Sequence, residues 1–281
     1  MKNKTIKEHQ KIVDSALYYI YRYIDTDINI DTLCQDLNIS RYHFQRVFKA
    51  IMGVNIYEYI KSIRLQKSAS LLLTNKGATI SEIAQMCGYS SQSSFIRAFK
   101  AKFNTTPKLW RGGEYKSYAK ANLKDLKTFE HIEPKILKTT PIEAHYIRHK
   151  GYTKEVKLIW QKVQSWVYHQ DIKEYRYIAL YHDNPIVTPL SECGYIAAVE
   201  IVDGIATKDD LSTFIIPSSV CATFEIEGAY GDILKLIEWV YNNWLPNSGF
   251  EATTLPSYTI FKQNHFLDNS HFVATYYLPI R

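Results

Sequence analysis

The sequence predicts a multidomain protein: an all-α domain with two helix-turn-helix units, followed by an α+β domain of two pseudo-symmetric β-α-β-β units. Residues 29–51 and 79–103 predict the first domain, because each combines a short capped helix, a turn and a polar second helix. Strand-like runs that alternate with two helices, at a nearly constant spacing, predict the second. We expect domains at residues 1–112 and 131–281, joined by a linker at residues 113–130.

Length and composition are those of a folded, soluble chain. Its 281 residues suffice for two domains of ordinary size, and 46% hydrophobic with 22% charged residues is typical of globular proteins. Apolar stretches are too short for a membrane span, and the first residues lack the apolar segment of a signal peptide. The four cysteines are scattered without metal-site spacing, which is typical of reduced thiols in a cytoplasmic protein.

Charge is distributed unevenly along the chain. Residues 1–116 contain 18 Lys and Arg against 9 Asp and Glu, whereas residues 117–281 contain 16 against 19. A basic first half indicates contact with a polyanion, although a well-solvated basic surface would produce the same excess.

The first helices follow from apolar spacing and capping residues. Residues 12–24 place apolar side chains along one helical stripe. Asn29 is a suitable N-cap for the next helix, Asn38 tolerates a left-handed turn, and Ser40 caps residues 41–50. These features predict the first helix-turn-helix unit.

The second unit repeats this arrangement after a longer helix at residues 56–73, which would join the two units rigidly. Thr79 and Glu82 have the spacing of a capping box. Gly88 suits the turn that follows, because glycine adopts positive φ at little cost.

Residues 8–111 resemble the AraC/XylS family of transcription regulators. The motifs that carry the resemblance are S-R-Y-H-F-Q-R-V-F-K-A at 40–50, G-Y-S-S at 88–91, S-F-I-R-A-F-K at 94–100, and Thr106-Pro107 followed by Trp110-Arg111. Asn104 replaces the family's usual glycine, and asparagine also tolerates a left-handed conformation. The resemblance implies that the second helix of each unit enters one of two successive major grooves.

Side-chain chemistry and this resemblance together indicate the DNA contacts. Arginine can pair with guanine, and glutamine with adenine, through two hydrogen bonds. The candidates for base contact are Tyr42, Gln45, Arg46, Gln92, Ser93 and Arg97. Arg41 lies on the outer face of the first reading helix, and Lys49 and Lys100 are expected to contact phosphates. Alternatively, Arg46 and Arg97 could form structural ion pairs, and Tyr42 could cover the hydrophobic seam.

The second half contains runs rich in β-branched and aromatic residues, which predict strands at residues 142–149, 176–181, 195–202, 220–227, 257–262 and 272–278. Helical spacing predicts helices at residues 153–169 and 230–245. Gly151 and Gly228 are 77 residues apart, and Trp166 and Trp244 are 78 apart, so the two units repeat in register. A groove between such units is a natural site for a small ligand.

Residues 133–281 resemble the GyrI-like effector-binding domain. The motifs are Y-H-D-N-P at 181–185, I-P-S-S-V at 216–220, E-G-A-Y at 227–230, N-N-W-L-P-N-S-G-F at 242–250 and Y-L-P-I at 277–280. The resemblance implies a site for bulky, often cationic, lipophilic molecules, with aromatic walls and a buried glutamate. That glutamate falls at Thr259 here, which removes the main reason for a cation to enter.

Candidates for the pocket are carboxylate and aromatic side chains. Glu225, or Glu227 beside it, could supply the missing carboxylate, against the alternative that both face solvent. The aromatic candidates are Trp160, Tyr181, Tyr230, Trp239, Tyr258 and Tyr276, each of which could instead belong to the core.

The expected function is a sequence-specific DNA-binding transcription regulator whose second domain binds a small aromatic or lipophilic effector. The alternative is a DNA-binding activator whose second domain no longer binds ligand and acts as a protein-interaction module. No residue set indicates catalysis, a metal or a cofactor. The expected partners are double-stranded DNA, RNA polymerase and a small lipophilic or cationic effector, with no membrane. A monomer or a dimer would suffice.

Overall fold

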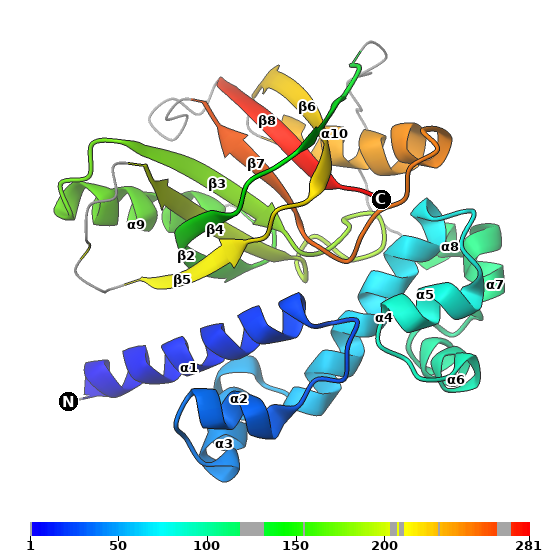
Figure 1. Ribbon diagram of the computed structural model, residues 1–281, viewed down its shortest axis with the longest axis horizontal. Coiled ribbons are helices and arrows are strands. Elements are labelled where there is room, and N and C mark those ends of the chain that lie inside the picture. The colour runs from blue at the N-terminus through cyan, green and yellow to red at the C-terminus, as the bar shows by residue number, and fades with distance from the viewer. Residues whose placement is uncertain are drawn as a thin grey trace. The chain divides into compact units, whose positions relative to one another are not determined.

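The computed structural model describes residues 2–118, 132–153, 155–202, 207, 211–229, 231–262 and 271–281. The chain divides into two compact units, residues 1–69 with 78–110, and residues 70–77 with 111–281. The first is helical and the second contains one eight-stranded sheet, so the predicted fold class is confirmed (Figure 1). Within the described ranges, no helix has the length and apolarity needed to span a membrane.

Two helix pairs build the first unit after the long helix α1 (Lys2–Arg22). The pairs are α2 (Ile30–Asp36) with α3 (Arg41–Met52), and α5 (Ile80–Met86) with α6 (Gln92–Phe103). The helix α4 (Ile56–Thr74) lies between the pairs, and α7 (Pro107–Leu109) follows the second. Both pairs have the predicted helix-turn-helix form.

The helix starts and turns carry the expected caps. The Asn29 side chain accepts hydrogen bonds from the amides of Asp31 and Thr32, at 2.9 and 3.2 Å. Thr79 and Glu82 form a reciprocal capping box. Asn38 and Gly88 adopt positive φ, 51° and 72°, at equivalent turns of the two pairs. Because the caps satisfy amides that a helix leaves unpaired, local sequence defines both turns.

Phenylalanine pairs on the second helix of each unit form its inner face. Phe44 and Phe48 of α3 are fully buried, as are Phe95 and Phe99 of α6. Burial of these faces leaves the polar faces of α3 and α6 toward solvent.

The helix α4 forms hydrogen bonds with the loop before α2 and with α6. Arg64 donates from Nε to the carbonyl of Ile24 at 3.1 Å, and its guanidinium also lies against Gly88, where an added Cβ would come within 2.6 Å. Lys102 of α6 donates to the carbonyl of Ser62 at 3.0 Å. Burial lowers the pKa of the Arg64 guanidinium. Arg64 therefore connects the loop before α2 with the turn before α6.

The first part of the expected linker contains helical segments. The segment η1 (Trp110–Glu114) is interrupted by a kink at Gly113, where φ is 123° and the backbone is not helical, and α8 (Tyr115–Tyr118) follows it. The rest of that linker, residues 119–130, lies outside the described residues.

Eight antiparallel strands form the sheet in the order β1-β6-β8-β7-β3-β4-β2-β5. The strands are β1 (Lys135–Lys138), β2 (Ile142–Lys150), β3 (Tyr175–Tyr181), β4 (Gly194–Ile201), β5 (Ser212–Ile216), β6 (Val220–Gly228), β7 (Ser257–Phe261) and β8 (Phe272–Pro279). The helices are α9 (Val156–His169) and α10 (Asp232–Trp239), which continues through η2 (Val240–Trp244) and η3 (Leu245–Asn247).

The sheet order contains the predicted internal symmetry. Read from one edge it is β5-β2-β4-β3, and from the other edge β1-β6-β8-β7, with β3 and β7 meeting at the centre. Each half contains one β-α-β-β unit. The sequence patterns did not predict β1 and β5, which form the two edges of the sheet, β1 beside β6 and β5 beside β2.

Both long helices cover the same face of the sheet. The strand register places Tyr177, Phe261 and Phe224 on one face. Trp160 of α9 contacts Tyr177 and Phe261 edge-to-face, at centroid distances of 5.5 and 5.8 Å. Trp239 of α10 contacts Phe224 in the same way at 6.4 Å. Aromatic side chains of both helices therefore pack against aromatic side chains of the sheet.

Candidate nucleic-acid interface and ligand pocket

The outer face of α3 lines an open groove. Tyr42 is 76% exposed, so its ring does not cover the hydrophobic seam. Tyr42, Gln45, Arg46 and Lys49 line this groove together with residues 55–58 at the start of α4. The structure thus brings four of the predicted DNA contacts of the first unit onto one surface.

The outer face of α6 carries the predicted contacts of the second unit. Gln92, Ser93, Arg97 and Lys100 are all exposed. Among the described residues, neither Arg46 nor Arg97 has an ion-pair partner. Both arginines are therefore available to an external acceptor. Their contact with bases remains a prediction.

Arg41 is engaged within the protein. Its Nη1 donates to both carboxylate oxygens of Asp31, at 3.1 and 3.2 Å, and its Nη2 donates to the Tyr57 hydroxyl. These bonds connect α2, α3 and α4 around the groove. Arg41 accordingly orients its neighbours, and a direct DNA contact from it remains a prediction.

The start of α4 supplies groove residues that sequence reasoning missed. Asn55 caps α4, because its Oδ1 accepts the amide of Glu58 at 2.9 Å. Tyr57 is 48% exposed and faces the groove from this first turn. The sequence did contain a signal for this helix start, because asparagine is a preferred N-cap residue and Asn55 directly precedes the helical pattern.

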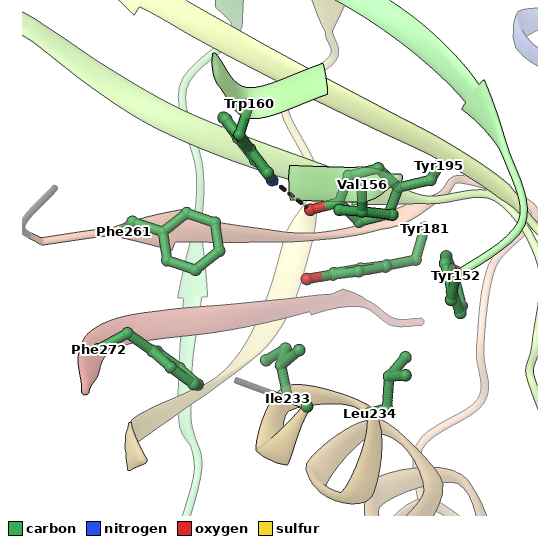
Figure 2. Close-up of a pocket in the computed structure, with 10 residues that line it drawn as sticks. Tyr152, Val156, Trp160, Tyr181, Tyr195, Ile233, Leu234, Phe261 and Phe272 are labelled. Carbon is green, nitrogen blue, oxygen red and sulfur yellow. Dashed lines mark hydrogen bonds between the residues drawn. The ribbon is translucent and has the colours of Figure 1, made fainter. Parts of the chain in front are cut away.

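The second unit contains a partly open cavity of about 90 Å³ between the sheet and its helices. We call it the aromatic pocket; its described lining is Tyr152, Val156, Trp160, Tyr181, Tyr195, Gly231, Ile233, Leu234, Phe261 and Phe272. Figure 2 shows aromatic rings from neighbouring strands on one side and Ile233 and Leu234 of α10 on the other. Trp160 donates from Nε1 to the Tyr195 hydroxyl at 2.9 Å.

Edge-to-face contacts hold the rings of the pocket. Tyr152, Tyr181 and Tyr195 contact one another with centroids 5.7 to 6.1 Å apart and interplanar angles of 65° to 84°. Burial raises the pKa of Tyr152 well above its usual value, so its hydroxyl keeps its proton at neutral pH.

Two of the seven predicted effector contacts, Trp160 and Tyr181, line the aromatic pocket. Tyr276 is fully buried on the same face, 6.3 Å from the Tyr181 ring, but is not part of the lining. Trp239 packs on Phe224, outside the lining. Tyr258 lies on the opposite face, stacked on Tyr277 at 4.7 Å. Tyr230 lies outside the described residues.

The carboxylate candidates do not reach the aromatic pocket. Glu225 neighbours Phe224 on β6, so its side chain points to the opposite face, where Lys262 and Thr275 donate to it. Burial raises the pKa of Glu225, but those hydrogen bonds outweigh it and leave the pKa below its usual value. Glu227, two residues on, shares that face and is exposed. Thr259 lies on the pocket's face of β7 and is fully buried.

Thiols and other metal-binding groups form no site in the described ranges. All four cysteines are free and buried, and burial raises the pKa of Cys87 to about 12. Within the described residues, His, Cys, Asp and Glu side chains do not gather into a group of three or more that could hold a metal.

Two family models match the chain. A helix-turn-helix domain matches residues 33–113, and a GyrI-like small molecule binding domain matches residues 132–281, which is more than half of the chain. A solved structure described as the EcmrR C-terminal domain is 14% identical, with a TM-score of 0.41, and the match covers 54% of this chain and 98% of that chain.

Curated relatives match the first unit. The probable transcription factor PqrA of Proteus vulgaris is 43% identical over 104 residues, which are 36% of this chain and 84% of PqrA. The regulatory protein SoxS of Escherichia coli (strain K12) is 34% identical over 103 residues, 37% of this chain and 95% of SoxS. Both relatives are described as regulators, one as a probable transcription factor and the other as a regulatory protein.

Proposed function

The chain belongs to the AraC family of DNA-binding transcription regulators and carries a GyrI-like domain, and we propose that it reads one DNA site with α3 and α6 under control of a small aromatic effector. RNA polymerase would be its further partner at promoters. The effector would act through different affinities for two states of the protein.

One observation carries the DNA-reading proposal: two repeat-equivalent helices expose the same combination of side chains. Arg46 and Lys49 on α3 have equivalents in Arg97 and Lys100 on α6, and all four are exposed. An arginine can read guanine and a nearby lysine can contact phosphate, so each helix combines base readout with positioning. A single chain would then occupy two successive major grooves.

The aromatic pocket supports the effector proposal. A GyrI-like domain is described as binding small molecules, and the cavity lies among aromatic side chains of the second unit. The alternative of an interaction module without ligand is favoured by Thr259, which occupies the position of the family's glutamate. The remaining open cavity favours a sensor.

A salt series with the full chain tests DNA reading. Affinity for a DNA site selected from a random library should fall steeply as salt rises, because lysine and arginine contacts release counterions. The double variant Lys49→Ala, Lys100→Ala should flatten that dependence by about two released ions. Lys157→Ala, on the exposed surface of α9, is the matched control and should leave the slope unchanged. Equal slopes for all three proteins would contradict the proposal.

Native mass spectrometry of the purified chain tests effector binding. A sensor should release a small aromatic compound on denaturation, or take one up from a library of aromatic compounds, and the bound form should change DNA affinity. If no compound in such a library binds, the interaction-module alternative replaces the sensor.

A further inference from the structure

We propose that the aromatic pocket accepts an uncharged aromatic ring and rejects a cationic ring of the same size and shape. This inference rests on the proposed effector function and names the chemical class of the effector. Three observations support it: the described lining has no charged side chain, the nearby carboxylates already have hydrogen-bond partners or lie outside the lining, and the cavity is small.

The described lining of the pocket carries no charged side chain. The polar side-chain atoms of the described lining are three tyrosine hydroxyls and the indole nitrogen of Trp160. The Tyr195 hydroxyl accepts the Nε1 hydrogen bond of Trp160, and the hydroxyl oxygens of Tyr152 and Tyr181 are buried. Figure 2 shows the rings, with Ile233 and Leu234, surrounding the space. A ligand therefore meets mainly carbon atoms.

Carboxylates beside the lining are engaged by other groups. Asp183, two residues after Tyr181, accepts the amide of Gly194 at 2.7 Å. Asp232, the first residue of α10, lies between the lining residues Gly231 and Ile233; it accepts the amide of Ala229 at 2.9 Å and pairs with Lys235 at 3.1 Å. Both carboxylates accept hydrogen bonds from nearby backbone amides, so neither is placed to neutralise a cation in the cavity.

Glu238 is the remaining acidic side chain to consider. It lies one turn after Leu234 on α10, outside the lining, and its Oε2 is buried without a hydrogen-bond partner among the described residues. Burial raises the pKa of Glu238, which favours its uncharged form. Because Glu238 lies outside the described lining, it does not place a carboxylate against a ligand in the cavity.

The balance of solvation decides the ligand class. A cation that enters the cavity loses its hydration, and no charge in the described lining replaces it. Ring faces can attract a cation, but these rings already direct edges and faces at one another. An uncharged aromatic ring loses little hydration and can join the edge-to-face pattern.

The cavity has room for at most one ring. Its volume of about 90 Å³ is below the roughly 150 Å³ of an engineered apolar cavity that binds benzene, so a single ring must seat closely against its walls. A larger ligand would leave its other groups at the open side. The charge of the inserted ring therefore decides whether it binds.

Toluene and N-methylpyridinium provide the test, because they share size and shape and differ in charge. Calorimetric titration of the full chain should show toluene binding about tenfold or more tightly than N-methylpyridinium. Tighter binding of N-methylpyridinium overturns the ligand class and leaves the effector function standing. If neither probe binds, both the effector function and this inference are overturned.

A pair of variants tests whether the preference for toluene arises at the lining of the aromatic pocket. Leu234→Glu places a carboxylate at the lining, in the first turn of α10, where an acidic residue suits a helix. It should reduce the preference for toluene severalfold or reverse it. Leu158→Glu makes the same change at an exposed position of α9 outside the lining and should leave the preference unchanged. An equal effect of both variants overturns the proposal, as does an unchanged preference in Leu234→Glu.

A second pair keeps the test valid if Leu234→Glu does not fold. Leu234→Trp should fill the cavity and abolish toluene binding, whereas Leu158→Trp should not. Circular dichroism establishes that each variant is folded. Toluene that still binds Leu234→Trp at full affinity sits elsewhere, and the proposal fails.

Discussion

At the residue scale, Arg97 and Lys100 of α6 should have different roles. Arg97→Ala should weaken binding to the preferred site by about 10- to 100-fold and relax base preference at one position, because a bidentate arginine–guanine pair contributes about 1–3 kcal/mol. Lys100→Ala should weaken binding similarly for all sequences and lower the salt slope by about one. Competition binding against a randomised site library measures both effects.

The roles are distinguishable because both side chains are exposed on one helix, three residues apart. A loss of base preference in Lys100→Ala, without one in Arg97→Ala, would contradict the assignment.

Thr259 offers a prediction for stability. Its hydroxyl is fully buried and has no hydrogen-bond partner among the described residues. Thr259→Val replaces that hydroxyl with a methyl group of similar size, so unfolding free energy should stay the same or rise by about 1 kcal/mol. Urea unfolding, followed by a probe in the second unit, measures the change.

Thr223→Val is the matched control on β6. The Thr223 hydroxyl donates to the carbonyl of Lys135 at 3.0 Å, so the free energy of unfolding of this variant should fall by about 1 kcal/mol. A larger loss in Thr259→Val than in Thr223→Val would show that the Thr259 hydroxyl is satisfied in solution.

The sequence predicted the direction of side chains on helices better than on strands. The helical repeat places Arg46 and Arg97 outward as soon as the buried phenylalanines are identified. On strands, alternate residues of an apolar run point to opposite faces, and the sequence does not indicate which face the helices cover. Tyr258 and Thr259 illustrate this, because both are buried and only Thr259 lies on the pocket's face.

At the element scale, the joint between α4 and the second helix pair can be tested at Gly88. Its φ of 72° disfavours other residues, and an added Cβ would come within 2.6 Å of the Arg64 guanidinium. Gly88→Ala should therefore displace Arg64 as well as strain the backbone. We expect a stability loss of about 2–3 kcal/mol and weaker DNA binding.

Gly53→Ala is the matched control at the end of α3. Gly53 has a similar φ of 75°, but an added Cβ would meet nothing within 4 Å. The stability of this variant should fall by about 1 kcal/mol, because only backbone strain acts on it. Thermal unfolding of both variants gives the comparison, and equal losses would show that the contact with Arg64 adds nothing.

Most elements could be predicted because their signals are local. Capping residues and apolar spacing indicate the helices, and β-branched runs indicate six of the eight strands. The two missed strands are short, and β1 has exposed side chains throughout, so it lacks an alternating apolar pattern. Their place in the sheet depends on pairing with distant strands.

At the scale of the whole molecule, the predicted division of charge agrees with the assigned roles. The basic excess lies in the part of the chain that contains α3 and α6, the two helices that we propose to read DNA. The pocket could be predicted as a class of site from the internal repeat. Its lining could not, because four strands, two helices and two loops contribute to it.

The measurement that tests the central claim most directly is a methylation-interference footprint of the full chain on its selected DNA site. Two reading helices predict two groups of essential guanines in successive major grooves, about ten base pairs apart. Arg46→Ala should remove the dependence on one group and Arg97→Ala on the other. A single group of guanines, or two groups that respond to neither variant, would contradict the claim that α3 and α6 read DNA together.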